Sequence, residues 1–114
     1  MGFFKRALEE DPQFPAAKFG LATLLTRIGR PEAAIPYYRA ALASWPTYEE
    51  ARYNLGLALA ATGKAQEASQ EYSAALRIRP DDADAHIALA KTLIALNHPD
   101  LAAEHYEQGL ALRP

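Results

Sequence analysis

The amino-acid sequence predicts an all-α protein, a single domain of stacked antiparallel helix hairpins with about seven helices. Alanine occurs 25 times and leucine 15 times in the 114 residues, and valine is absent. Alanine and leucine lose little side-chain freedom in a helix, where β-branched residues are stiff. Proline recurs every 34 residues, and a glycine or asparagine recurs at the same step between the prolines. Such a fixed step indicates a chain built from repeated structural units.

The prolines divide the chain into a half unit and three full units. They lie at Pro12, Pro46, Pro80 and Pro114. Because proline cannot continue a helix, each one marks the end of the second helix of a unit. We therefore expect a half repeat at residues 1–14 that holds a second helix alone. Full repeats should follow at 15–48, 49–82 and 83–114.

Within each full unit, a residue that tolerates the left-handed backbone conformation separates two helices. These residues are Gly29, Gly63 and Asn97. First helices are then expected at 15–28, 48–62 and 82–96. Second helices are expected at 2–10, 32–44, 65–79 and 99–112.

Several helix starts carry a sequence signal of their own. Residues 47–50 read Thr-Tyr-Glu-Glu, which fits a capping box, and Asp81 is a good N-cap for the following first helix. Pro31 and Pro99 suit a first helical turn. Pro36 lies one turn inside its helix, where it should cost a backbone hydrogen bond or bend the helix.

Other positions that recur at the same step predict how the helices pack. Small residues, which let the two helices of a hairpin approach closely, recur at Ala22, Gly56 and Ala90, with Ala34, Ala68 and Ala102 expected opposite them. Aromatic residues, which fill the space left by the small ones, recur at Phe4, Tyr38, Tyr72 and Tyr106.

These positions resemble the tetratricopeptide repeat family over essentially the whole chain. The family signature reads W-x₂-L-G-x₂-Y, then A-x₃-F, then P. The unit that matches it best has Leu55, Gly56, Ala68, Tyr72 and Pro80 at the corresponding places. The resemblance implies a right-handed superhelix, an α-solenoid, whose first helices line the concave side. That side is the usual ligand surface in such proteins.

One departure from the family pattern concerns the position where tryptophan is common. This chain has Lys18, Arg52 and His86 there. One interpretation is that their stems cover apolar surface while their charged heads reach water. The other is a basic ladder along one edge of the stack.

The resemblance places a ligand-binding groove on the concave side. The residues expected to bind a protein or peptide there are Phe19, Thr23, Arg27, Tyr53, Asn54, Leu57, Ile87, Lys91 and Ile94. An apolar trough rimmed by a few charges suits an extended or helical peptide with apolar anchors. The alternative is that Phe19, Tyr53 and Ile87 are ordinary packing residues, and such a position can serve both purposes.

A subclass of the family grips a C-terminal carboxylate with lysine, asparagine and arginine on three successive first helices. The corresponding positions here are Phe19, Thr23, Asn54, Asp84 and Ala88, and Asn54 alone matches. Asp84 puts negative charge where a carboxylate would bind. We therefore expect no carboxylate clamp.

Composition gives no sign of catalysis, cofactors, nucleic acid or membrane. The chain has no cysteine, a formal net charge of −2 and no long apolar run. His98 and His105 lie near Asp100 and Glu104 but lack the spacing of helical metal ligands. We predict no enzyme activity, no cofactor and no metal. The start of the chain lacks a signal peptide, which favours a cytoplasmic location.

The expected function is a protein–protein interaction scaffold that binds a peptide or protein segment in the groove. One alternative is an accessory segment of a larger protein, such as a glycosyltransferase or sulfotransferase. Another is self-association into a homo-oligomer through the ends of the stack, because a terminal hairpin leaves apolar residues without a neighbour. The residues concerned are Leu93, Leu101, Tyr106 and Leu110.

Overall fold

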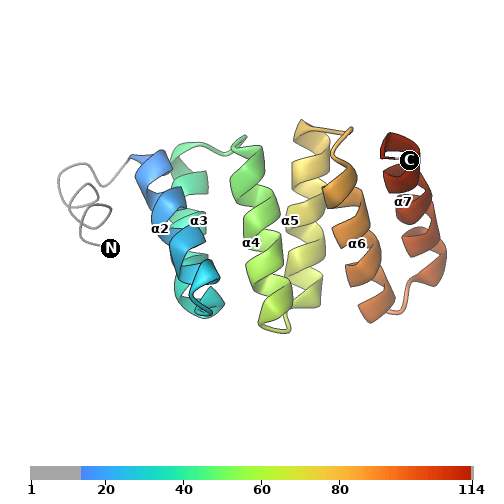
Figure 1. Ribbon diagram of the computed structural model, residues 1–114, viewed down its shortest axis with the longest axis horizontal. Helices are drawn as coiled ribbons and strands as arrows, with labels where there is room; N and C mark the ends of the chain where they lie inside the picture. The colour runs from blue at the N-terminus through green and yellow to red at the C-terminus, as the bar shows by residue number, and fades with distance from the viewer. Residues whose placement is uncertain (1–13, 114) are drawn as a thin grey trace.

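The fold was analysed in a computed structural model, which describes residues 14–113. These residues form six helices and no strand (Figure 1). The helices are α2 (Pro15–Arg27), α3 (Pro31–Ser44), α4 (Glu49–Ala61), α5 (Ala65–Ile78), α6 (Ala83–Ala95) and α7 (Pro99–Leu112). Every bound lies within one residue of its prediction. The second helix expected at 2–10, and with it most of the half repeat 1–14, lies outside the described residues.

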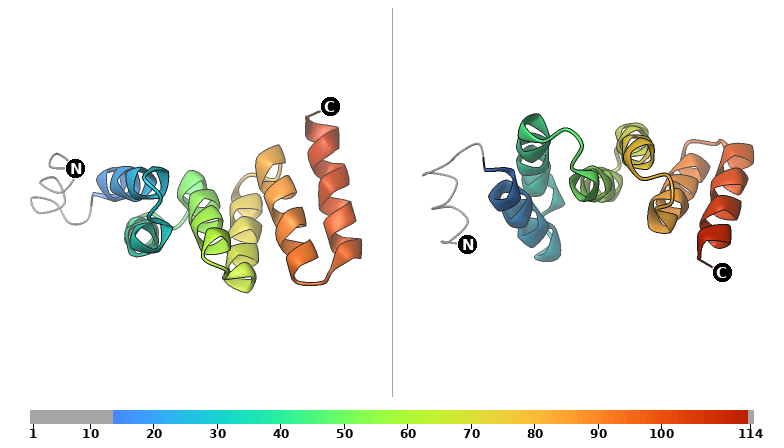
Figure 2. Two further views of the ribbon diagram at one scale, coloured as in Figure 1. Left: turned by 60° about the horizontal axis from the view of Figure 1, so that its bottom comes forward. Right: turned by 90° about the horizontal axis from the view of Figure 1, so that it is seen from above.

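The helices pair into three hairpins that follow one another along a body of 47 × 25 × 22 Å (Figures 1 and 2). Each helix packs on the next one in the chain. In addition, α4 contacts both α2 and α6. By contrast, no Cα atom of α3 lies within 8 Å of one in α5, and none of α5 lies within 8 Å of one in α7. The first helices therefore form a continuous inner row, as a concave side requires, and the second helices spread apart on the outside.

The same turn joins the two helices of every hairpin. Gly29 and Gly63 both have a φ angle of 82°, and Asn97 has a φ angle of 65°. In each turn the next residue donates a 2.8 Å backbone hydrogen bond to a carbonyl five residues earlier, as from Lys64 to Leu59. This satisfies a carbonyl that the helix end would leave unpaired. The predicted role of these three residues is confirmed.

The predicted pairing of small and aromatic residues forms the core of the hairpins. Tyr38 and Tyr72 are each 1 % exposed. A Cβ atom built on Gly56 would lie 2.5 Å from Cε1 of Tyr72, so the ring occupies the space that the missing side chain leaves. Ala22 and Ala34 are fully buried as well. This core continues across repeats, because a single buried cluster includes residues of α2, α3, α4 and α5 together with one of α6.

Two predicted helix caps are wrong. The N-cap of α4 is Tyr48, which makes no side-chain cap, and the Thr47 hydroxyl instead accepts a 3.1 Å hydrogen bond from Nε1 of Trp45. At α6 the N-cap is Asp82 rather than Asp81, and its Oδ1 accepts a 3.2 Å hydrogen bond from the backbone N–H of Ala85.

The prolines inside helices lie where they were expected. Pro31 and Pro99 stand in the first turns of α3 and α7. Pro36 lies inside α3, which continues to Ser44, and its ring is exposed. An exposed position lets water reach the carbonyl that lost its N–H partner, which limits the cost of this proline.

Candidate functional site

A hollow of about 310 Å³ opens between α4 and α6 on the inner side of the stack. We call it the α4–α6 hollow; its lining includes Tyr53, Leu57, Tyr72, Ile87 and Lys91. Tyr53 tilts against Tyr72, with 5.8 Å between ring centroids, so an α5 ring supports an α4 ring at the wall. The structure thus brings together four of the residues that the sequence assigned to the groove: Tyr53, Leu57, Ile87 and Lys91.

A smaller hollow of about 90 Å³ lies between α2 and α4, the α2–α4 hollow. Its lining includes Thr23, Arg27, Asn54 and Leu57, which were all predicted groove residues. The hydroxyls of Thr23 and Thr26 each lie 3.4 Å from the Tyr38 hydroxyl. Leu57 borders both hollows and is 40 % exposed. The two hollows therefore form one surface across the inner row, which we call the groove.

Two predicted groove residues line neither hollow. Phe19 is half-buried, with its ring 5.9 Å from that of Tyr38 and 4.9 Å from that of Tyr48, as in ordinary aromatic packing. Ile94 is 54 % exposed beyond the hollows. Ile87 both lines the α4–α6 hollow and packs against α7, since its Cγ1 lies 2.8 Å from where a Cβ of Gly109 would be.

A third and more polar cavity, of about 450 Å³, adjoins the α4–α6 hollow, with which it shares Tyr53 and Asp84. We call it the acidic pocket, because five carboxyl groups line it, those of Glu49, Glu50, Asp81, Asp82 and Asp84. That these residues lie together was not predicted from the sequence. A signal was present, since Glu50 and Asp84 are 34 residues apart and so occupy equivalent places on neighbouring first helices.

The carboxyl group of Glu49 is unusual among these groups. Its side chain is 10 % exposed, and its Oε1 is buried without a hydrogen-bond donor. Burial, followed by a hydrogen bond to the carboxyl of Asp82, raises the pKa of Glu49 to about 7. Burial pushes the pKa of Asp82 upward, but its hydrogen bonds with Glu49 and with the N–H of Ala85 outweigh burial and hold it below the usual value. The two carboxyl groups therefore share one proton near neutral pH.

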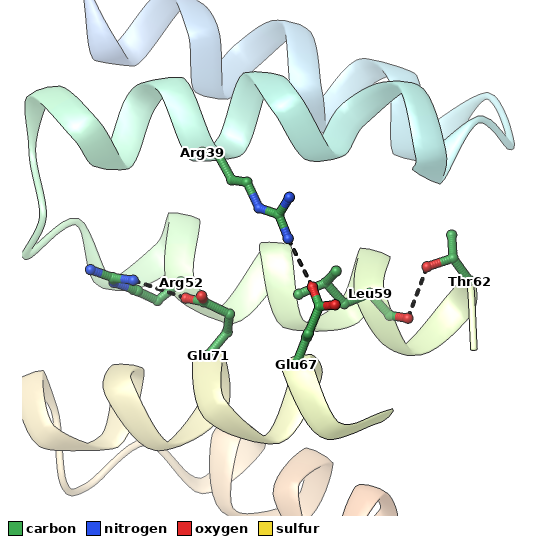
Figure 3. A network of polar contacts seen from close by, with 6 residues as sticks. All are labelled: Arg39, Arg52, Leu59, Thr62, Glu67 and Glu71. Atoms are coloured by element: carbon green, nitrogen blue, oxygen red, sulfur yellow. Dashed lines mark hydrogen bonds and ion pairs between the residues drawn. The ribbon is translucent and has the colours of Figure 1, made fainter. Parts of the chain in front are cut away.

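The residues at the usual tryptophan position do not form a basic ladder. Arg52 donates from Nε to the carbonyl of Pro46 at 3.2 Å. Its Nη1 donates to Glu71 at 3.0 Å (Figure 3). The head of this side chain is thus held by the protein, and the interpretation that it simply reaches water is wrong for Arg52. Lys18 occupies the equivalent position in the first full unit and is also buried, with 8 % of the residue exposed.

His86 repeats the Arg52 arrangement one unit later. Nε2 of His86 lies 2.9 Å from the carbonyl oxygen of Pro80, and Nδ1 lies 3.0 Å from Nδ1 of His105. Because the carbonyl can only accept, Nε2 of His86 carries the proton and its Nδ1 accepts from His105. Burial, and then the nearby His86, lower the pKa of His105.

Two further findings concern residues 14–113. Among them no group of three or more His, Cys, Asp or Glu side chains is arranged to hold a metal ion. None of their six helices has both the length and the apolar character needed to cross a bilayer.

Stacked two-helix units with a hollowed inner row define the class of helical-repeat scaffolds. Two models of the tetratricopeptide repeat match the chain, one over residues 4–49 and 27–83 and the other over residues 59–114. The chain belongs to the tetratricopeptide repeat family. It is accordingly a protein–protein interaction scaffold in its general role. No curated protein sequence matches it.

Solved structures of MamA share this fold. One crystal structure of MamA superposes with a TM-score of 0.95 at 27 % identity, covering 97 % of this chain and 65 % of that one. A second gives 0.90 at 23 % identity, covering 96 % and 60 %, and a structure of MamA AMB-1 gives 0.88 at 23 %, covering 96 % and 64 %. The chain thus spans less than two thirds of the length of these proteins. The predicted all-α solenoid is confirmed.

Proposed function

We propose that the chain binds a segment of a partner protein in the groove, with an apolar side chain of that segment in the α4–α6 hollow. The observation that carries the proposal is the position of Leu57. It borders both hollows and keeps 40 % of its surface exposed at their junction. Covering exposed apolar surface of this kind is the main source of affinity when a peptide docks in a groove.

The charges near the groove support the expectation that it does not take a C-terminal carboxylate. Asp84 borders the α4–α6 hollow, and Glu50 stands at the equivalent place on α4. A carboxylate at this end of the groove would meet like charge. The nearest groove cation, Lys91, lies two turns of α6 further on.

The groove is tested with peptides selected from a random display library and measured by fluorescence anisotropy. Leu57→Glu should weaken their binding by about tenfold or more, since it places a charge in an apolar contact. Leu101→Glu is the matched control, because Leu101 is 48 % exposed on α7 and lines neither hollow. Both variants should retain the helical circular dichroism signal. Equal binding by the wild type and Leu57→Glu, or loss of binding in the control, contradicts the proposal.

Self-association is the second candidate, and the exposure of equivalent residues favours it. Leu42 is 6 % exposed and Leu76 is half-buried, whereas the equivalent Leu110 is 62 % exposed. Tyr106 and Leu93 are likewise half-buried where their equivalents in earlier repeats are buried. In the first two units these places are covered by the following repeat. The outer face of α7 therefore suits a first helix of a second copy.

A further inference from the structure

The acidic pocket lies where two helix starts meet two helix ends. The first turns of α4 and α6 contribute Glu50 and Asp84, and the segments that follow α5 and α7 contribute Arg79 and Arg113. Five carboxyl groups face two guanidinium groups, which gives a formal charge of −3 when all are ionised. The cavity of about 450 Å³ is within the range of ligand sites and has room for a long side chain.

Glu49 provides an independent sign that this pocket lacks a partner. The side chain is nine-tenths buried, and its Oε1 receives no hydrogen bond from the described residues. The nearest cation is Arg79, whose Nη1 is 3.9 Å from Oε2 of Glu49 and whose Nε is 3.7 Å from Asp81, both too long for hydrogen bonds. The proton held between Glu49 and Asp82 relieves this cost only while the pair is protonated. Once both groups are ionised, Oε1 of Glu49 has no donor, so a donor supplied from outside would be stabilising.

One guanidinium already binds at the rim of the pocket. Nη1 of Arg113 donates to Oδ1 of Asp84 at 2.8 Å, and both side chains are at least half exposed. This contact demonstrates the kind of group that these carboxylates accept. Among the described residues, Glu50 and Asp82 have no ion pair, and Glu49 has only the 3.9 Å contact with Arg79. A planar guanidinium can engage two carboxylates at once, which an ammonium does less well.

We propose that the acidic pocket binds an arginine side chain of the same partner segment whose apolar side chain occupies the α4–α6 hollow. Tyr53 and Asp84 border both cavities, so the two side chains would lie close together on one segment. This inference rests on the proposed function of the groove. It adds the chemistry of the partner, a basic residue next to an apolar one.

Binding of the arginine should be linked to a proton. The groups that face Glu49 are Asp82 from α6, Glu50 from α4 and Arg79 from the segment after α5. A guanidinium needs both carboxyl groups of the Glu49–Asp82 pair ionised, whereas the free pocket retains a proton there because the pKa of Glu49 is about 7. Affinity for the arginine should therefore rise as pH rises through 7.

The pocket is tested first without any peptide, with argininamide as the probe. Titration to about 10 mM, followed by NMR of the backbone amides, should shift the signals of Glu50, Tyr53 and Asp84. Citrullinamide has nearly the same shape and the same α-amino group but a neutral group in place of the guanidinium, and it should leave these signals in place. Equal shifts with both probes, or no shift, overturns the proposal, and equal affinity for lysinamide overturns the assignment to arginine.

Variants then test the pocket residues. The double variant Glu50→Gln with Asp84→Asn should weaken argininamide binding by about tenfold, the value of one charge-assisted pair. Asp82 is left unchanged because it caps α6. Glu32→Gln, an exposed change on α3, controls for the general loss of negative charge. Arg113→Gln should strengthen binding, because it frees Asp84, and unchanged or weaker binding in this variant counts against the proposal.

Peptides separate this inference from the proposed function. Nonapeptides with one leucine and one arginine at different separations are compared with twins that carry citrulline. Binding that is lost in Leu57→Glu and is about tenfold weaker for citrulline supports both proposals. Binding that needs Leu57 but does not distinguish arginine from citrulline overturns this inference alone. If argininamide binds and no peptide binds, the proposal that the groove holds a partner segment is overturned, and the arginine site in the acidic pocket is supported.

Discussion

Nδ1 of His86 lies 3.0 Å from Nδ1 of His105, at the place where the preceding repeat pairs Arg52 with Glu71. The residues of the two pairs are 34 apart, so the same link between first and second helix is built once from an ion pair and once from two imidazole rings. An imidazole pair of this kind is sensitive to acid, because two protonated rings at this distance repel each other.

We therefore predict that the contribution of the histidine pair to stability decreases as pH falls below about 6.5. The folded state lowers the pKa of His105 below its ordinary value of 6.5, so the unfolded chain takes up the proton first. The contribution of His105 to the free energy of unfolding then has its full value above this pH and decreases below it. Urea unfolding at pH 7.5 and at 5.5 measures the change.

The control for this prediction is the double variant His86→Arg with His105→Glu, which copies the ion pair of the preceding repeat. Glu49 acts in the opposite direction, since its raised pKa favours folding at low pH and this contribution is lost between 4.5 and about 7. Glu49 is the same in both proteins, so the difference between them reports the histidines. An equal pH dependence in both proteins would contradict the prediction.

The close approach of Gly56 to Tyr72 predicts a destabilising alanine. Gly56→Ala places a Cβ 2.5 Å from Cε1 of the ring. Overpacking costs about 1–3 kcal/mol. Alanine has a higher helix propensity than glycine, which offsets up to about 1 kcal/mol of this cost. Thermal unfolding should show a net loss of about 1–2 kcal/mol. In a protein that already carries Tyr72→Leu, Gly56→Ala should no longer be destabilising. If the losses of the two single variants simply add in the double variant, the contact with Tyr72 is not the cause.

The positive φ angle of Gly63 predicts a difference between two substitutions. Gly63→Ala should lower the free energy of unfolding by about 1–2 kcal/mol, because a Cβ is unfavourable at a φ angle of 82°. Gly63→Asn should cost less, since Asn97 adopts the same conformation in the third turn. No atoms lie within 4 Å of a Cβ at Gly63, so a loss cannot come from a clash. Equal losses in both variants, measured by urea unfolding, would argue against the backbone explanation.

Self-association through α7 predicts a concentration-dependent mass in sedimentation experiments. Leu110→Gln should shift the protein toward the monomer, because Leu110 is 62 % exposed where its equivalents pack on the next repeat. Leu101→Gln is the control. Leu101 was also assigned to the uncovered end from the sequence, but its equivalent Glu67 is exposed, so the next repeat does not cover this place. A strict monomer up to millimolar concentration, or an equal effect of both changes, speaks against the prediction.

The sequence predicted the helices closely because their ends depend on local chemistry. Gly63 and Pro80 stop helices through their own backbones, whatever surrounds them. The caps were predicted wrongly for the opposite reason, because they depend on residues outside the helix. Asp81 and Asp82 are chemically equal candidates, and the choice between them depends on where α6 begins after it packs on α5. At Thr47 the predicted capping box is absent, because Nε1 of Trp45 donates a hydrogen bond to the hydroxyl that the box would use.

The candidate site was predicted less completely, because its polar residues act across helices. The role of Arg52 depends on Glu71, which lies 19 residues later on another helix. Glu49 and Asp82 look like ordinary helix-end carboxylates when each helix is considered alone. Their shared proton appears when the starts of α4 and α6 are placed side by side. By contrast, Leu57 and Ile87, which line the hollows, were expected on the inner side because the family resemblance places the first helices there.

The outer side of the stack has a consequence for its mechanics. Where the backbones of α3 and α5 stay apart, Arg39 and Glu67 span the gap with a 2.9 Å ion pair that is about half exposed (Figure 3). Such a pair contributes about 0–1 kcal/mol and weakens in salt. The outer side of the stack is therefore joined at this place by a weak ion pair, while the backbones of the first helices contact one another directly. Flexing of the solenoid would change the distance between α3 and α5 and leave the distances between the first helices, which enclose the cavities beside α4, nearly constant.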